Sequence, residues 1–166
     1  MVELLISTRG GQFTARYSEK GLAELNFPNG RTDLPVSPDA RQRVPTKIAK
    51  WHRVTEIALK SILAGNKPKT LPPLDLAGTE FQKSVWNALR KISLGETKSY
   101  GEVARAIGRP KAVRAVGGAC GANPVPVLVP CHRVLAANKK LGGFSGGLDW
   151  KRSLLKREGI NLPSAG

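Results

Sequence analysis

Residues 99–121 read SYGEVARAIGRPKAVRAVGGACG and carry the strongest indication of the fold. Ser99 and Glu102 have the spacing of a capping box, in which a hydroxyl and a carboxylate bond the free N–H groups at a helix start. Gly108 then interrupts the apolar pattern, and a second helix is expected to end near Gly121. Two short helices joined by a tight glycine turn predict a helix-turn-helix.

The second of these helices has almost no bulky side chains. Its small residues are Ala112, Ala115, Gly117, Gly118, Ala119, Gly121 and Ala122. A helix of this kind is typical either of close packing against a neighbour or of entry into a narrow groove, and both interpretations remain open. The DNA minor groove is about 6 Å wide, against about 12 Å for the major groove. We favour the groove, with Arg114 as the long cation that fills a gap in a disturbed base stack.

The block Pro130-Cys131-His132-Arg133-Val134 follows an apolar segment, residues 123–129. Free cysteine is usually a small buried hydrophobe. The repeated prolines of the segment, however, are incompatible with a central strand and favour a rigid extended segment. His132 and Arg133 are expected to favour the thiolate of Cys131, which would make it reactive.

Asn123 and Glu158 are two further candidates for the site around Cys131. Asn123 is either a turn residue or the C-cap of the preceding helix. Glu158 is either an ordinary last-turn glutamate or a buried partner of His132. In the second case, Cys131, His132 and Glu158 would form the nucleophile–base–orienter arrangement of covalent catalysis.

The charge distribution indicates a polyanionic partner. The chain has 27 Lys and Arg against 12 Asp and Glu, a net charge of +15, and no acidic residue occurs between Val103 and Leu148. That stretch contains Arg105, Arg109, Lys111, Arg114, Arg133, Lys139 and Lys140. A field of one sign attracts phosphate backbones and speeds encounter with them. Nucleic-acid binding is therefore favoured over a merely solvated basic surface.

The first half of the chain predicts a small mixed domain. Strands are expected over residues 2–7, 12–17 and 22–27, an irregular connection over residues 28–45 and a helix over residues 46–64. Residues 68–73 look like a linker, so we place a domain boundary near residue 75. In the second half, Thr79 and Gln82 form a second capping box. A last helix is expected over residues 148–158 before Gly159.

These patterns predict an α+β protein with an N-terminal structural domain (1–76) and a C-terminal functional domain (77–166). No apolar run approaches the roughly 18–20 residues that span a bilayer, and the N-terminus lacks a signal-peptide pattern. We therefore expect no membrane association and an intracellular location, the cytoplasm or a eukaryotic nucleus. Two cysteines and two histidines predict neither a disulfide framework nor a zinc site.

The segment from Asn123 to Val134 resembles the active-site signature of the O6-alkylguanine-DNA alkyltransferases, also called methylated-DNA–protein-cysteine methyltransferases. The likeness extends from about Thr79 to Glu158 and so covers most of the C-terminal half. It implies a ribonuclease H-like N-terminal domain and a winged-helix-like helix-turn-helix in the C-terminal domain. It also implies irreversible transfer of an alkyl group from guanine O6 in double-stranded DNA, with O4-alkylthymine as an additional substrate, to Cys131 itself.

The resemblance also implies a role for each matched residue. His132 would accept the thiol proton through a water, with Glu158 as its orienter. Asn123 would tie the DNA-reading helix to the active-site segment. Tyr100 would donate a hydrogen bond to the departing guanine and help to rotate the target phosphate. The pocket would be lined by Ser145, Phe144 and Val134. Arg114 would replace the flipped nucleotide, and further DNA contacts are expected from Lys111, Ala115, Arg109 and Arg133.

Two departures from the family pattern matter. The first half of the chain lacks the Cys and His residues of the zinc site that some members have, with His52 its only candidate, so no metal and no cofactor is expected. Phe144 stands where some members have tyrosine, which puts the preference among methyl and bulkier adducts in doubt. We expect a monomer, with clustering of copies on DNA left open.

Two other classes of function compete with suicide alkyl transfer. A non-enzymatic helix-turn-helix module, either a transcription factor or a lesion sensor, would bind DNA without covalent transfer. The sensor's family lacks the acceptor cysteine, which argues against it. A cysteine hydrolase would use the Cys131–His132 pair but would explain neither the basic stretch nor the small-residue helix.

Overall fold

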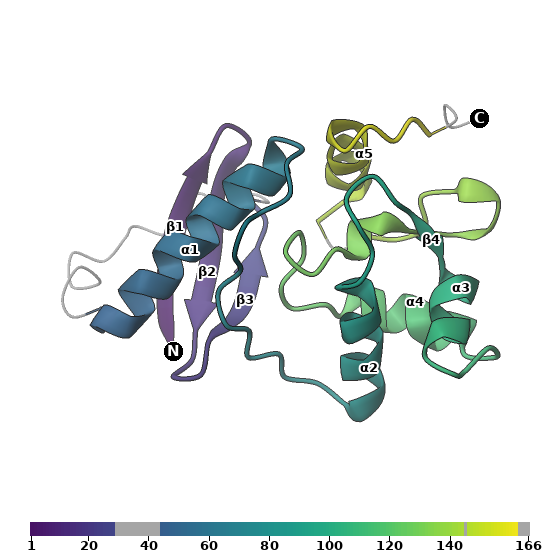
Figure 1. Ribbon diagram of the computed structural model, residues 1–166, viewed down its shortest axis with the longest axis horizontal. Coiled ribbons are helices and arrows are strands. Elements are labelled where there is room, and N and C mark those ends of the chain that lie inside the picture. The colour runs from purple at the N-terminus through teal and green to yellow at the C-terminus, as the bar shows by residue number, and fades with distance from the viewer. Residues whose placement is uncertain (29–43, 145, 163–166) are drawn as a thin grey trace.

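Three antiparallel strands and one long helix form the N-terminal half of the protein (Figure 1). The computed structural model describes residues 1–28, 44–144 and 146–162. The strands are β1 (Val2–Thr8), β2 (Gly11–Tyr17) and β3 (Leu22–Asn26), in the sheet order β1-β2-β3. Helix α1 (Thr46–Leu63) lies across one face of this sheet. The predicted irregular connection at 28–45 falls almost entirely outside the described residues.

The periodicity of each element explains its placement. Alternate residues of the central strand, Phe13, Ala15 and Tyr17, are fully buried, because side chains two apart along a strand share a face. On α1 the buried positions recur at helical spacing. They are Ile48, Thr55, Ala58, Leu59 and Ile62. The predictions of three strands and this helix are confirmed to within one or two residues.

The C-terminal half is mainly helical. Its helices are α2 (Glu80–Leu89), α3 (Tyr100–Ala106), α4 (Val113–Gly121) and α5 (Leu148–Arg157), with two 3-10 helices, η2 (Cys131–Arg133) and η3 (Ala137–Lys139). Both predicted capping boxes are present: the Thr79 hydroxyl accepts from Gln82 N, and the Ser99 hydroxyl accepts from Glu102 N. The α3–turn–α4 unit confirms the helix-turn-helix spacing, and the α+β class is confirmed as well.

A short parallel strand pair connects the helix-turn-helix to the cysteine segment. Strand β4 (Lys98–Ser99) pairs with β5 (Val134–Leu135), with Lys98 opposite Val134. The pairing holds the start of α3 beside the end of η2. Strands of two residues have no periodicity that a sequence can reveal, and the pair was not predicted.

The segment predicted as a linker is bound to the sheet instead. Leu22 N donates to Pro73 O, and Asp75 N donates to Leu22 O. Leu74 thereby forms a parallel bridge with Leu22 at the start of β3. The end of the connection therefore extends the sheet locally, and the chain enters the C-terminal half from a fixed position.

Aromatic side chains join the two halves. Phe27, just after β3, contacts Phe144 and Trp150 of the C-terminal half, at ring-centroid distances of 5.4 Å and 5.2 Å. Phe13 of β2 contacts both Phe27 and Trp150. One hydrophobic core includes residues from both halves. The N-terminal sheet therefore supports the loop that precedes α5.

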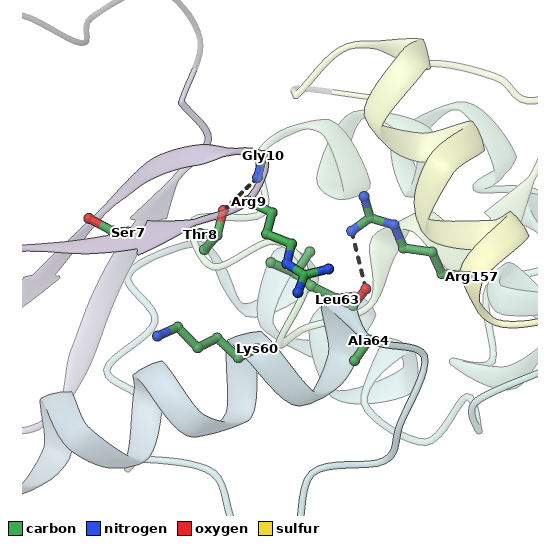
Figure 2. Close-up of a pocket in the computed structure, with 8 residues that line it drawn as sticks. All are labelled: Ser7, Thr8, Arg9, Gly10, Lys60, Leu63, Ala64 and Arg157. Carbon is green, nitrogen blue, oxygen red and sulfur yellow. Dashed lines mark hydrogen bonds between the residues drawn. The ribbon is translucent and has the colours of Figure 1, made fainter.

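A second contact between the halves lies at the end of α1 (Figure 2). The Arg157 guanidinium, at the end of α5, donates to Leu63 O at 3.1 Å. The β1–β2 turn and Lys60 complete a cavity of about 940 Å³ around this hydrogen bond. None of the helices in the described part of the chain is both long and apolar enough to cross a membrane.

Candidate active site

The active-site segment is held in place by Asn123, directly after the C-cap of α4. The Asn123 Nδ2 donates to Val129 O at 2.8 Å, and its Oδ1 accepts from Val125 N at 3.0 Å. Val127 between these two contacts has φ of 75°, which is strained for a β-branched residue. The buried Asn123 amide therefore fixes the conformation of residues 123–129, and Cys131 lies at the end of this segment.

His132 and Glu158 form a buried pair. His132 Nε2 donates to Glu158 Oε2 at 2.7 Å, and both side chains are fully excluded from solvent. A carboxylate only accepts hydrogen bonds, so this contact places the ring proton on Nε2 and leaves Nδ1 as the acceptor of the neutral ring. Nδ1 is buried and has no hydrogen-bond partner among the described residues. His132 thus has the tautomer of a general base.

Glu158 is shared with Arg133. The guanidinium donates from Nε to Glu158 Oε1 at 2.7 Å and from Nη2 to Oε2 at 3.3 Å. Its Nη1 donates to Ile92 O at 2.8 Å. Because Arg133 is buried and occupied by these partners, the prediction that it contacts DNA is corrected: it is a structural cation behind the site.

The electrostatics of Cys131 also differ from expectation. Burial raises the pKa of the Cys131 thiol to about 11, although the Asn123 side chain and Lys151 act to lower it. Neither His132 nor Arg133 stabilises the thiolate, since both are turned toward Glu158. The prediction that these two neighbours favour a resting thiolate is therefore wrong. Cys131 rests as a thiol and needs a base to become a nucleophile.

The protonation states of His132 and Glu158 suit a proton transfer from the thiol. Burial lowers the pKa of His132, outweighing the Glu158 hydrogen bond, which raises it. Burial acts to raise the pKa of Glu158, but the hydrogen bonds from His132 and Arg133 prevail and lower it. Around neutral pH the ring is therefore neutral and its partner ionised, which is the state that accepts a proton.

Lys151 is a site residue that the sequence did not reveal. It is completely buried, its Nζ donates to Gly143 O at 3.3 Å, and it lies 6.0 Å from the centre of the Tyr100 ring. No carboxylate of the described residues forms an ion pair with it. Burial lowers its pKa, while the nearby Cys131 and Cys120 raise it. A lysine in an amphipathic helix gives no sign in the sequence that it faces inward.

The loop before α5 closes onto Tyr100. Gly142 has φ of +68°, and a Cβ at this position would lie 2.6 Å from Tyr100 Oη. Only glycine therefore fits here, for both conformational and steric reasons. Phe144 is half-buried against Phe27. Val134 is buried in β5, and Ser145 lies outside the described residues.

The small-residue face of α4 is open. Val116, Ala119 and Cys120 face the core, and Trp86 Nε1 donates to Ala119 O at 2.8 Å. A Cβ added at Gly117, Gly118 or Gly121 would meet nothing within 4 Å in the described part of the chain. Close helix packing therefore does not explain these glycines, which favours the alternative of an approaching ligand.

The other four residues predicted to contact DNA are exposed on α4 or just before it. Lys111, Arg114 and Ala115 are exposed at the start of α4. Arg109 is exposed in the preceding turn, with its guanidinium 5.9 Å from the centre of the Phe81 ring. The surface is basic and accessible, as a phosphate-binding surface requires.

Within the described residues, no three His, Cys, Asp or Glu side chains gather as a metal site. His52 is engaged on both ring nitrogens, by the Tyr17 hydroxyl at 2.8 Å and by Leu5 O at 3.2 Å. It is therefore a satisfied core histidine without a free lone pair for a metal.

The sequence of the chain matches one group of known proteins. The sequence profile described as "6-O-methylguanine DNA methyltransferase, DNA binding domain" matches residues 80–160. A Methanosarcina mazei protein named methylated-DNA–protein-cysteine methyltransferase is 60% identical over 147 residues, 87% of this chain and 88% of that protein. Its namesake in Methanosarcina acetivorans is 47% identical over 141 residues, 85% and 87% of the two chains. The chain belongs to this family.

Solved structures agree with membership of the methyltransferase family. The crystal structure of Mycobacterium tuberculosis OGT in complex with DNA has a TM-score of 0.72 and 37% identity, with 93% of this chain and 90% of that chain covered. An O6-methylguanine DNA methyltransferase from Methanococcus jannaschii has a TM-score of 0.67 and 30% identity, with coverage of 98% and 97%. The resemblance recognised in the sequence is thereby confirmed.

Proposed function

We propose that this methyltransferase-family protein repairs DNA by moving the alkyl group of O6-alkylguanine onto Cys131, once per molecule. O4-alkylthymine is proposed as an additional substrate. The observation that carries the proposal is the His132 ring, which is neutral, buried and held by Glu158, and which directly follows Cys131 at the end of the Asn123-bound segment. A soft sulfur nucleophile suits attack on an alkyl carbon.

The reaction balances within these groups. His132 Nδ1 takes the proton of the Cys131 thiol, through a water, as the sulfur approaches the alkyl carbon. The S–C bond forms while the C–O6 bond breaks, the electron pair stays on the guanine, and the proton that His132 took is passed on through water to the guanine anion. Tyr100 donates a hydrogen bond to that leaving group, which lowers the barrier. The product is a thioether, whose C–S bond is stable to hydrolysis, so each molecule acts once.

DNA reaches the thiol through the open face of α4. An alkyl carbon inside a duplex is inaccessible, so the base must leave the stack. The proposed path puts α4 in the minor groove, where Gly117 and Gly118 leave room and Ala115 adds little bulk. Arg114 would fill the space of the extruded nucleotide. Lys111 and Arg109 would bind the flanking phosphates.

The pocket for the extruded base is proposed from the loop above Tyr100. Phe144, Ser145 and Val134 would line it, with Ser145 contacting O6. Phe27 and the lysine at 151 support this loop through the aromatic contact and the Gly143 hydrogen bond. No metal or cofactor takes part in the proposed reaction.

Domain assignments follow the same proposal. Residues 1–76 would be a structural domain of ribonuclease H-like type, supported by the order of three antiparallel strands followed by a helix. Residues 77–166 would be a winged-helix-like DNA-binding and alkyl-transfer domain. The protein would act as a monomer in the compartment that holds the chromosome, the cytoplasm in a cell without a nucleus.

Labelling with a free guanine-type pseudosubstrate tests the proposal. Incubation should label one site per protein, and Cys131→Ala should abolish labelling. A lesion-sensing module would bind alkylated duplex without acquiring label. A cysteine hydrolase would turn over an ester repeatedly. Label on Cys120 in place of Cys131, or label retained in Cys131→Ala, would overturn the proposed chemistry.

A further inference from the structure

A second basic surface lies at the junction of the two halves, away from α4. It surrounds a cavity of about 450 Å³ between the connection after α1 and the end of α2. Four of the lining residues are exposed cations: Lys67, Lys69, Arg90 and Lys91. None of the residues that line this cavity is acidic. We call these four residues the junction patch.

The charges of the junction patch are not neutralised by the chain itself. None of the four forms an ion pair with an acidic side chain among the described residues, whereas the exposed Lys60 and Lys98 each have a glutamate partner. Four like charges around one cavity repel each other and attract an external polyanion.

Helix α2 separates the junction patch from the α4 surface. Phe81 in its first turn contacts Arg109 of the helix-turn-helix, while Arg90 is its C-cap residue. Arg90 follows Phe81 by nine positions, which corresponds to about 14 Å along a helix at 1.5 Å per residue. Pro130 and Arg133 line the cavity from behind the active-site segment. The two basic surfaces thus lie at opposite ends of one rigid element.

We propose that the junction patch binds the phosphate backbone of a second DNA segment, so that one molecule bridges two duplexes. The four cations are three flexible lysines and one arginine on an exposed rim, which suits phosphate contacts without base readout. A DNA backbone supplies several negative charges at once, enough to pair with the four cations of the junction patch. A protein bound to DNA through α4 also meets other DNA segments at high local concentration.

The inference rests on the proposed function, since it assumes that α4 holds the first duplex. A molecule with two DNA-binding surfaces could pass from one segment to another without full release. Four phosphate contacts would make capture of the second duplex fall about 150-fold between ~50 and ~200 mM salt. Two contacts would leave a fall of only about 12-fold over the same range.

A sandwich capture experiment tests bridging. A short duplex is immobilised, the full-length protein is added, and capture of a second, labelled duplex is measured against salt. The wild type should capture it, with one protein molecule between two duplexes by native mass spectrometry. Lys69→Glu/Arg90→Glu should reduce capture at least tenfold and flatten the salt dependence. Alkyl transfer from a single short duplex should stay unchanged in this variant.

The matched control is Lys50→Glu/Arg53→Glu, which makes the same charge change at exposed positions of α1. Bridging is refuted if the wild type captures no second duplex, if both variants lose capture equally, or if each bridge holds two protein molecules. Preferential capture of an acidic protein over DNA would also refute it. Alkyl transfer by the wild type distinguishes these outcomes from failure of the proposed function, because transfer without capture contradicts the bridging inference alone.

Discussion

The His132 ring and the Glu158 carboxylate are joined by a 2.7 Å hydrogen bond, and neither side chain is exposed to solvent. The same carboxylate receives two hydrogen bonds from the Arg133 guanidinium. One buried anion therefore orients the proposed base and neutralises a structural cation. The proposed catalysis and the stability of the fold would therefore both depend on Glu158.

Glu158→Gln should impair both properties. The amide keeps the shape but loses the charge, and removal of one partner from a buried ion pair costs about 3–5 kcal/mol. We expect a loss of that order in the free energy of unfolding, together with a slower single-turnover rate. Denaturant unfolding and rapid-quench kinetics measure the two effects. Glu56→Gln, which removes the exposed partner of Lys60, is the control and should cost less than about 1 kcal/mol.

Acid should destabilise the protein through His132. In the unfolded chain this histidine has its ordinary pKa of 6.5, and in the folded protein its pKa is lower. At a pH between the folded and the unfolded pKa, the unfolded chain therefore binds a proton that the folded protein does not. The stabilising contribution is thus fully present above about pH 6.5 and is lost as the pH falls toward the folded-state pKa. His52, whose pKa burial also lowers, acts in the same direction. Thermal unfolding at pH 7.5 and 5.5 should show a lower Tm at the acidic value.

The pH dependence of the rate tests how the thiol is activated. The Cys131 pKa is about 11, so a reaction of pre-formed thiolate would accelerate tenfold per pH unit through the neutral range. Transfer of the proton to neutral His132 predicts a nearly flat rate from about pH 6.5 to 8.5 instead. A tenfold rise per unit in the labelling rate would contradict general-base activation.

Lys151→Met should distinguish the effect of the Lys151 charge on the labelling rate from the effect of its packing on stability. The substitution keeps a long side chain but removes the buried cation that acts to lower the Cys131 pKa. We expect a several-fold lower labelling rate, because loss of this cation raises the pKa of the Cys131 thiol further. Stability should be unchanged or higher, because a buried charge without a carboxylate partner is costly. Lys156→Met, at an exposed position of the same helix, should change neither quantity.

Gly118→Leu should separate DNA binding from chemistry. A Cβ there meets nothing within 4 Å in the described part of the chain, and a helix interior gains up to about 1 kcal/mol when glycine is replaced by a good helix former. The variant should be at least as stable as the wild type and react normally with the free pseudosubstrate. Repair of a duplex lesion should fail, because the helix no longer fits a narrow groove. Equal loss on both substrates would exclude groove entry by this face.

Arg114→Ala should also impair repair of duplex DNA more than reaction with the free pseudosubstrate, but for a different reason. The side chain is exposed and is proposed to occupy the space of the extruded nucleotide. We expect reaction with duplex lesions to slow much more than reaction with the free pseudosubstrate, as measured in parallel single-turnover assays. A similar loss in both assays would argue against this role.

Local signals in the sequence predicted most of the fold. Capping boxes at Thr79 and Ser99, the glycines that follow α1, α3 and α5 and the alternation in β2 depend only on neighbouring residues, so these elements could be predicted from the sequence. The family signature around Cys131 also identified the pairing of His132 with Glu158, which the structure contains.

Contacts between distant residues could not be predicted in this way. Arg133 looked like a DNA contact because it follows Cys131, but its direction depends on Glu158 and Ile92 O. The sequence did not single out Lys151, because its burial depends on the loop that contains Gly143, whose carbonyl accepts from its Nζ. The reactive state of Cys131 likewise depends on burial, which composition does not report. Each of these errors concerns the environment of a charged or titratable group.

The mass of the protein after reaction with O6-methylguanine duplex tests the proposed repair reaction most directly. With excess DNA, every molecule should gain one methyl group, peptide mapping should place it on Cys131, and no second event should follow. The restored guanine should equal the methylated protein in amount. Continued removal of methyl groups after all protein is consumed, transfer to Cys120, or repair by Cys131→Ala would contradict the proposal.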